Sequence, residues 1–125
     1  MLTVATLLSV LFMTLHLADD IVRGMEAGGL SSLIVVPIVV ALLYGIAVLG
    51  EGRSGYVIIF IVSLLLLIVP VIHMKGKGVG VASGIASSSG GFFFVWTLIA
   101  LGVTALISVI LSVRGLWRLR RTTAD

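Results

Sequence analysis

The sequence predicts an all-α protein embedded in a membrane as an up-and-down bundle of four helices, in one domain over residues 1–125. Of its residues 60% are hydrophobic and only 10% are charged, whereas a soluble domain carries about 25% charged residues. A soluble fold of this size cannot hide so much apolar surface, so lipid must cover part of it. Four long apolar runs, separated by polar or glycine-rich breaks, predict four helices that cross the bilayer.

The first helix is expected over about residues 1–27. The run from Met1 to Ala18 is about 27 Å long at the helical rise of 1.5 Å per residue, which is close to the thickness of the hydrocarbon core. A secretory signal peptide fits less well, because the run has no basic start and cleavage after Ala18 would place His16 where a small residue is needed. The pair Gly28-Gly29 predicts the end of this helix.

The second helix is expected over about residues 30–50, with Ser31-Ser32 supplying an N-cap. Pro37 lies inside this run and is expected to kink the helix. Ala41 and Gly45 put two small side chains on one face, so another helix can approach closely there.

The third helix is expected over about residues 55–74. The turn before it, residues 51–54, is so short that the second and third helices must be antiparallel neighbours. Pro70 lies one turn before His73, near the far end of the run. The glycine- and serine-rich stretch that follows, residues 75–91, is expected to form a flexible loop on the outer side of the membrane.

The fourth helix is expected over about residues 92–113 and is followed by a basic tail, residues 114–125, with Trp117 at the membrane interface. Small residues recur at every fourth position of this helix and predict a second close-packing seam, at Ala100, Thr104, Ser108 and Ser112. The arginines of the tail are expected to contact lipid headgroups, namely Arg114, Arg118, Arg120 and Arg121.

The orientation follows from the basic residues. Four crossings put both termini on one side, and that side holds five of the eight Lys and Arg residues, most of them in the tail. Basic residues favour the cytoplasmic side, so we expect both termini in the cytoplasm of a multi-pass protein of a bacterial plasma membrane. The same bias accounts for the net charge of +3 without nucleic acid as a partner.

One polar cluster interrupts the apolar pattern, at the end of the first helix. At about 100° per residue its members fall within an arc of roughly 120° and form a single stripe. The stripe consists of His16, Asp19, Asp20, Arg23 and Glu26. His73 lies at about the same depth on the third helix. The first and third helices of such a bundle are diagonal, on the order of 13 Å apart, a distance that two inward imidazoles can span.

Four interpretations of the stripe compete. The simplest is a solvated helix end, with Asp19 and Arg23 as an i,i+4 ion pair. The second is a divalent metal site, because imidazole and carboxylate ligands suit Zn²⁺, Mn²⁺ and Fe²⁺; its ligands would come from His16, Asp19, Asp20 and His73, with Arg23 and Glu26 in support. The third is a b-type haem held by His16 and His73. The fourth is a quinone or another organic ligand. Because polar groups that face lipid are costly, the stripe is expected to point inward.

The sequence carries no catalytic motif. It has no cysteine, which excludes thiolate nucleophiles and iron–sulfur ligation, and no serine is placed beside either histidine. Residues 76–80 are glycine-rich but lack the spacing of a phosphate-binding loop. We therefore favour a non-enzymatic membrane protein with an external ligand or metal site. A non-catalytic accessory subunit of a larger membrane complex comes second, and a small transporter formed by self-association third, because the centres of all four runs are uncharged.

Overall fold

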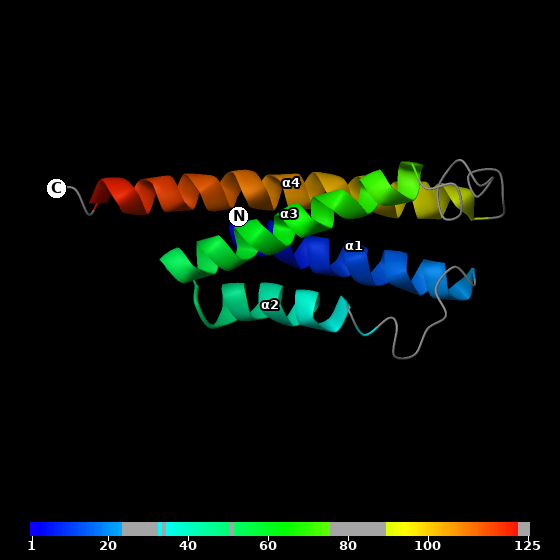
Figure 1. Cartoon of the computed structure of the whole chain (residues 1–125), viewed down its shortest axis with the longest axis horizontal. Coiled ribbons are helices and arrows are strands. Elements are labelled where there is room, and N and C mark those ends of the chain that lie inside the picture. The colour runs from blue at the N-terminus through cyan, green and yellow to red at the C-terminus, as the bar shows by residue number, and fades with distance from the viewer. Residues whose placement is uncertain (24–32, 34, 51, 76–89, 123–125) are drawn as a thin grey trace.

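The chain folds into four α-helices, seen in a computed structural model that describes residues 1–23, 33, 35–50, 52–75 and 90–122 (Figure 1). They are α1 (Leu2–Val22), α2 (Val35–Ala47), α3 (Arg53–Lys75) and α4 (Gly91–Thr122). The all-α class and the number of helices agree with the prediction. The expected glycine end of the first helix, the serine cap of the second and most of the loop after the third lie outside the described residues, as does Glu26.

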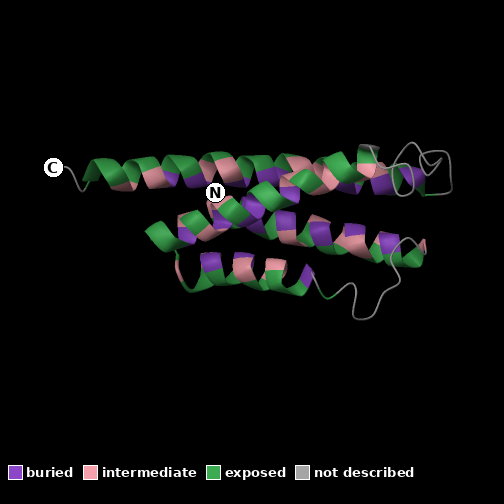
Figure 2. Cartoon of the chain, in the orientation of Figure 1, coloured by how far each residue is buried: buried purple, intermediate pink, exposed green. Residues whose placement is uncertain are grey.

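Three of these helices are long and apolar enough to cross a membrane, which indicates a membrane protein: α1, α3 as far as Met74, and α4. The 13 residues of α2 are apolar but shorter; at 1.5 Å per residue they reach about 20 Å of a hydrocarbon core of about 30 Å. Large apolar side chains cover the outside of the bundle, as in Leu65, Ile99 and Val103, while the buried residues lie where helices face one another (Figure 2).

The helices alternate in direction along the bundle (Figure 1). The long helix α4 packs along both α3 and α1, and α2 packs chiefly on α3. Contacts between α1 and α3 are few, so these two helices lie diagonally, as expected. The C-terminal ends of α1 and α3 and the N-terminal end of α4 meet at one end of the bundle.

Small and hydroxylated residues let the helices pack closely. Gly45 of α2 faces Ile59 of α3, where a β-carbon would lie 3.1 Å from the isoleucine side chain. Ser108 is fully buried, and its hydroxyl donates a hydrogen bond to the carbonyl of Thr104 in its own helix. The two small-residue faces expected from the sequence are therefore used inside this chain, because they bring α2 onto α3 and α4 onto its neighbours.

Pro37 lies at the third position of α2, in the first turn of the described helix. The first turn of a helix leaves its N–H groups without intrahelical partners, so the missing N–H of a proline costs nothing there. Pro70, by contrast, lies inside α3, as the sequence predicted.

The fourth helix is longer than predicted, because it continues through Thr122 and includes most of the expected tail. Gly115 does not end it; the absence of a side chain there lets the ring of Tyr56 from α3 lie against α4. Arg120 and Arg121 lie in the last turn, where their positive charges interact favourably with the negative end of the helix dipole.

Candidate metal centre at one end of the bundle

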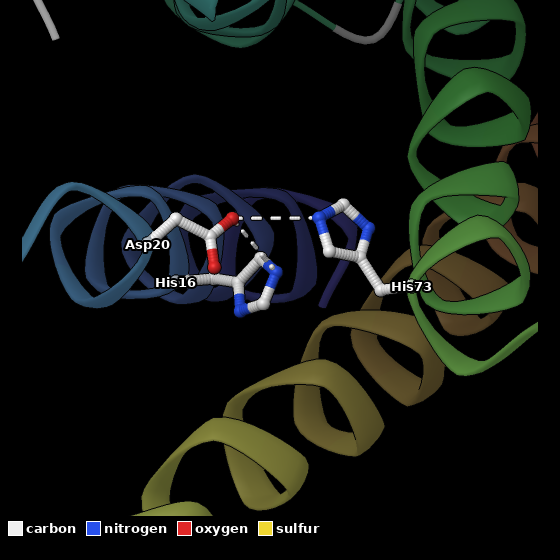
Figure 3. A group of neighbouring side chains, drawn as sticks. All are labelled: His16, Asp20 and His73. Atoms are coloured by element: carbon white, nitrogen blue, oxygen red, sulfur yellow. Dashed lines mark ion pairs between the residues drawn. The ribbon is translucent and has the colours of Figure 1, made fainter. Parts of the chain in front are cut away.

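A cluster of two histidines and one aspartate lies where the ends of α1, α3 and α4 meet (Figure 3). His16 and Asp20 are one turn apart on α1, so they share a face of that helix. His73 reaches them from the last turns of α3. The two histidines that the sequence placed at similar depth on diagonal helices therefore converge.

The polar atoms of this cluster lie close together. Oδ2 of Asp20 lies 3.5 Å from Nε2 of His16 and 3.4 Å from Nε2 of His73. One ligand atom from each residue can be chosen so that all three lie within 4.8 Å of one another.

The cluster is shielded from solvent. His16 is 1% exposed and Asp20 is 3% exposed, whereas the side chain of His73 is 19% exposed. A carboxylate in such surroundings is costly unless a cation or several hydrogen bonds compensate its charge. Asp20 also lies in the last turn of α1, where the negative end of the helix dipole raises that cost. A metal ion, a proton or hydrogen bonds must therefore compensate the charge of Asp20.

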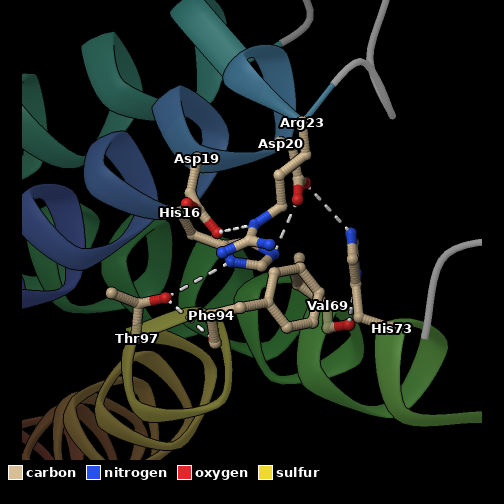
Figure 4. A network of polar contacts seen from close by, with 8 residues as sticks. All are labelled: His16, Asp19, Asp20, Arg23, Val69, His73, Phe94 and Thr97. Carbon is tan, nitrogen blue, oxygen red and sulfur yellow. Dashed lines mark hydrogen bonds and ion pairs between the residues drawn. The ribbon is translucent and has the colours of Figure 1, made fainter. Parts of the chain in front are cut away.

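The ring of His73 is oriented by its own helix. Its Nδ1 lies 2.9 Å from the carbonyl oxygen of Val69, so the Nδ1–H group donates a hydrogen bond there (Figure 4). In the neutral ring, Nε2, the atom that faces Asp20, then carries a lone pair. A backbone carbonyl behind a histidine is the usual support of a metal-binding imidazole.

The ring of His16 is oriented by Thr97 of α4, so that its Nε2 also faces Asp20. The Thr97 hydroxyl donates to the carbonyl of Phe94 at 3.0 Å, which leaves its oxygen free to accept. Nδ1 of His16 lies 3.4 Å from that oxygen, so a protonated Nδ1 can donate to it. Nε2 of His16 then carries a lone pair, is buried and makes no hydrogen bond, and the second carboxylate oxygen of Asp20 makes none either.

Three electron-pair donors thus point toward one buried region. Two imidazole nitrogens and a carboxylate repel one another there unless a proton or a metal ion lies between them. The spacing suits a metal: with bonds of about 2.0–2.1 Å and a tetrahedral arrangement, ligand atoms are about 3.3 Å apart. Two of the three separations, 3.4 and 3.5 Å, are close to that value.

Two other residues of the stripe, Asp19 and Arg23, form a separate pair. Nε of Arg23 lies 2.7 Å from Oδ2 of Asp19, in the i,i+4 arrangement that the sequence predicted. The guanidinium also lies 6.0 Å from the ring centre of Phe94, on the side where α4 begins. The structure thus places Asp19 with Arg23 and places Asp20 with the histidines, whereas the sequence could not separate the two acids.

The geometry argues against a haem between the two histidines. Bis-histidine ligation needs the imidazoles on opposite faces of a flat macrocycle. The centroids of the His16 and His73 rings are only 4.8 Å apart, in edge-to-face contact at 76°. These rings touch, so the macrocycle has no room between them.

Thr97 and Phe94 were missed by the sequence analysis, although both contact the cluster. A signal existed for Thr97, because it lies seven residues before Thr104 and so continues the buried seam of α4 toward its N-terminal end. No signal marks Phe94, whose ring centre lies 5.0 Å from that of His16.

The arginines expected to contact lipid lie on the last turns of α4, at the opposite end of the bundle from the cluster. Comparisons with protein-family models, with curated proteins and with solved structures give no match to this chain.

Proposed function

We propose that this protein binds a divalent transition-metal ion at the membrane surface, through His16, Asp20 and His73. The observation that carries the proposal is the convergence of Nε2 of His16, Nε2 of His73 and a carboxylate oxygen in a buried region, with both Nδ1 atoms engaged elsewhere. Such a set of neutral imidazoles and one carboxylate is complementary to a metal cation.

The ligand chemistry selects a class of ions. Two histidines and one carboxylate suit Zn²⁺, Fe²⁺ and Mn²⁺, whereas Ca²⁺ and Mg²⁺ prefer oxygen ligands. Three protein ligands leave at least one coordination position for water or another small ligand. His73 is the most exposed of the three ligands, so an ion from solution can reach it first.

We further propose that the metal end faces the outside of the cell and that the termini lie in the cytoplasm. Arg53 at the start of α3 and four arginines in the last turns of α4 lie at the end opposite the cluster. That distribution is the one that the positive-inside rule associates with the cytoplasmic side. The role that fits is external metal binding or sensing, without catalysis.

The accessory-subunit alternative is weaker. It relied on the small-residue faces of the second and fourth helices as docking surfaces, but Gly45 packs on Ile59 and Ser108 is buried inside the bundle. A partner would have to bind the apolar outer surface, which lipid can also cover.

Metal titration of the purified protein tests the proposal. The full chain in detergent, stripped with a chelator, is titrated with Zn²⁺, Mn²⁺ and anaerobic Fe²⁺, and bound metal is counted by elemental analysis. We expect one ion per chain, with affinity reduced on the order of 100-fold or more in His16→Ala and His73→Ala. Asp19→Asn is the matched control, because it removes the neighbouring carboxylate and leaves the three ligands in place.

His73→Ala keeps the test valid if His16→Ala fails to fold, because His73 is the less buried of the two. Stoichiometric binding that survives His73→Ala would overturn the site. A Soret band in the visible spectrum would indicate haem instead. Lack of metal binding, with copurification of a larger assembly, would favour the accessory role.

A further inference from the structure

The basic end of the bundle contains a cleft. It has a volume of about 350 Å³ and lies between the start of α1, the start of α3 and the last turns of α4. The residues that line it include two arginines, Arg114 and Arg118, and two leucines, Leu2 and Leu111. We propose that this cleft binds the phosphate of an anionic lipid headgroup.

The charge at this end is complementary to a phosphate. Arg114 and Arg118 are one turn apart, so they project from one face of α4 and both border the cleft. The planar donors of a guanidinium group match the oxygens of a phosphate. Within the described part of the chain the acidic residues are Asp19 and Asp20, both at the far end of α1, so no described carboxylate competes for these arginines.

The shape of the cleft depends on one close contact. Gly115 has no side chain, and the ring of Tyr56 occupies the space where a β-carbon would be. Both residues line the cleft, together with the two arginines. The aromatic ring therefore forms part of a preformed surface.

The apolar wall favours a lipid over a free anion. Leu2 and Leu111 line the cleft beside the arginines, and Ile110 and Val113 on the adjoining turn of α4 are exposed. Acyl chains can cover that apolar surface while the headgroup phosphate stays with the guanidinium groups. Trp117, also exposed, lies just beyond, in the position of an interfacial tryptophan.

The structure also separates the four arginines that the sequence treated as equivalent. Arg121 is stacked on Trp117, with its Cζ atom 3.7 Å from the ring centre. Arg120 lines a different cleft, with Arg53 of α3. Of the four, Arg114 and Arg118 therefore border the proposed site, and Arg121 is the control of equal charge.

The test measures binding of short-chain phosphatidylglycerol, below its micelle concentration, to the full chain in a non-ionic detergent. Each arginine near a membrane contributes about 1 kcal/mol to anionic lipid binding, which corresponds to roughly fivefold in affinity. We expect Arg114→Gln and Arg118→Gln each to weaken binding about fivefold, and Arg121→Gln to leave it within about twofold. Phosphatidylcholine of the same chain length is expected to bind markedly more weakly than phosphatidylglycerol.

Three outcomes would overturn the proposal. Equal losses in Arg114→Gln and Arg121→Gln would show that only diffuse charge attracts the lipid. Equal affinity for phosphatidylcholine would show that the acyl chains alone bind. Inorganic phosphate that binds as tightly as phosphatidylglycerol would make this a site for a free anion. If circular dichroism shows that Arg114→Gln is misfolded, Arg118→Gln tests the same cleft.

Discussion

Nε2 of His73, on α3, lies 3.4 Å from Oδ2 of Asp20, on α1. The two helices make few contacts along the rest of their lengths. This polar contact therefore joins the two diagonal helices at one end of the bundle. The two groups repel each other when His73 is neutral and Asp20 is ionised, and a proton or a metal ion between them makes the contact favourable.

Asp20→Asn is expected to stabilise the metal-free protein and to abolish its stabilisation by metal. The amide removes a buried negative charge and can donate a hydrogen bond to an imidazole nitrogen that has no partner, a gain of about 1–3 kcal/mol in the free energy of unfolding. At a metal concentration 100 times the Kd, the free energy of unfolding of the native protein should rise by about 2.7 kcal/mol, whereas that of the variant should hardly change. Thermal unfolding in detergent with and without Zn²⁺ measures both effects. A metal-free variant that unfolds at a lower temperature than the native protein contradicts this prediction.

Thr97→Val is expected to weaken metal binding about tenfold while leaving the fold intact. Valine has nearly the same shape as threonine but cannot accept the hydrogen bond from Nδ1 of His16, and loss of such an outer partner costs about 10- to 100-fold in affinity. Thr104→Val is the control, because that hydroxyl donates to the carbonyls of Ala100 and Leu101 within α4. Equal affinities for the two variants would show that Thr97 does not orient the ring.

Gly115→Ala is expected to destabilise the bundle by about 1–3 kcal/mol, because the new methyl group would collide with the ring of Tyr56 where α3 and α4 are in contact. Gly102→Ala is the matched control. Its β-carbon would lie 3.5 Å from Pro70, an ordinary contact, and alanine is the better helix former by about 1 kcal/mol. In detergent, the melting temperature should therefore fall in Gly115→Ala and rise or stay the same in Gly102→Ala. Similar melting temperatures would contradict the packing seen at Tyr56.

The proposed orientation predicts that cysteines placed at Ser88 and Thr123 lie on opposite sides of the membrane. The chain has no native cysteine, so each variant carries a single reactive thiol. A membrane-impermeant maleimide added to intact cells should label Ser88→Cys, and it should label Thr123→Cys only after the membrane is opened. Labelling of both from outside would show that α4, the helix between the two positions, does not cross the membrane, and would overturn the four-span topology.

The sequence alone determined the class of this protein and the inward face of its first helix. Composition and run length predict apolar helices because lipid is the only solvent that tolerates so much exposed hydrocarbon. The helical angle places His16 and Asp20 on one stripe because positions four apart share a face. Both inferences are local, since each depends on residues within a few turns of one helix.

The tertiary structure decided which groups meet. His16 and Thr97 are 81 residues apart in the sequence, and no local pattern records that contact. It also decided that Asp20 faces His73 while Asp19 pairs with Arg23, a distinction of one residue that rotates a side chain by about 100° around the helix. Which of two adjacent acids joins the histidines depends on where α3 and α4 pack, and packing is fixed by the shapes of whole helix faces.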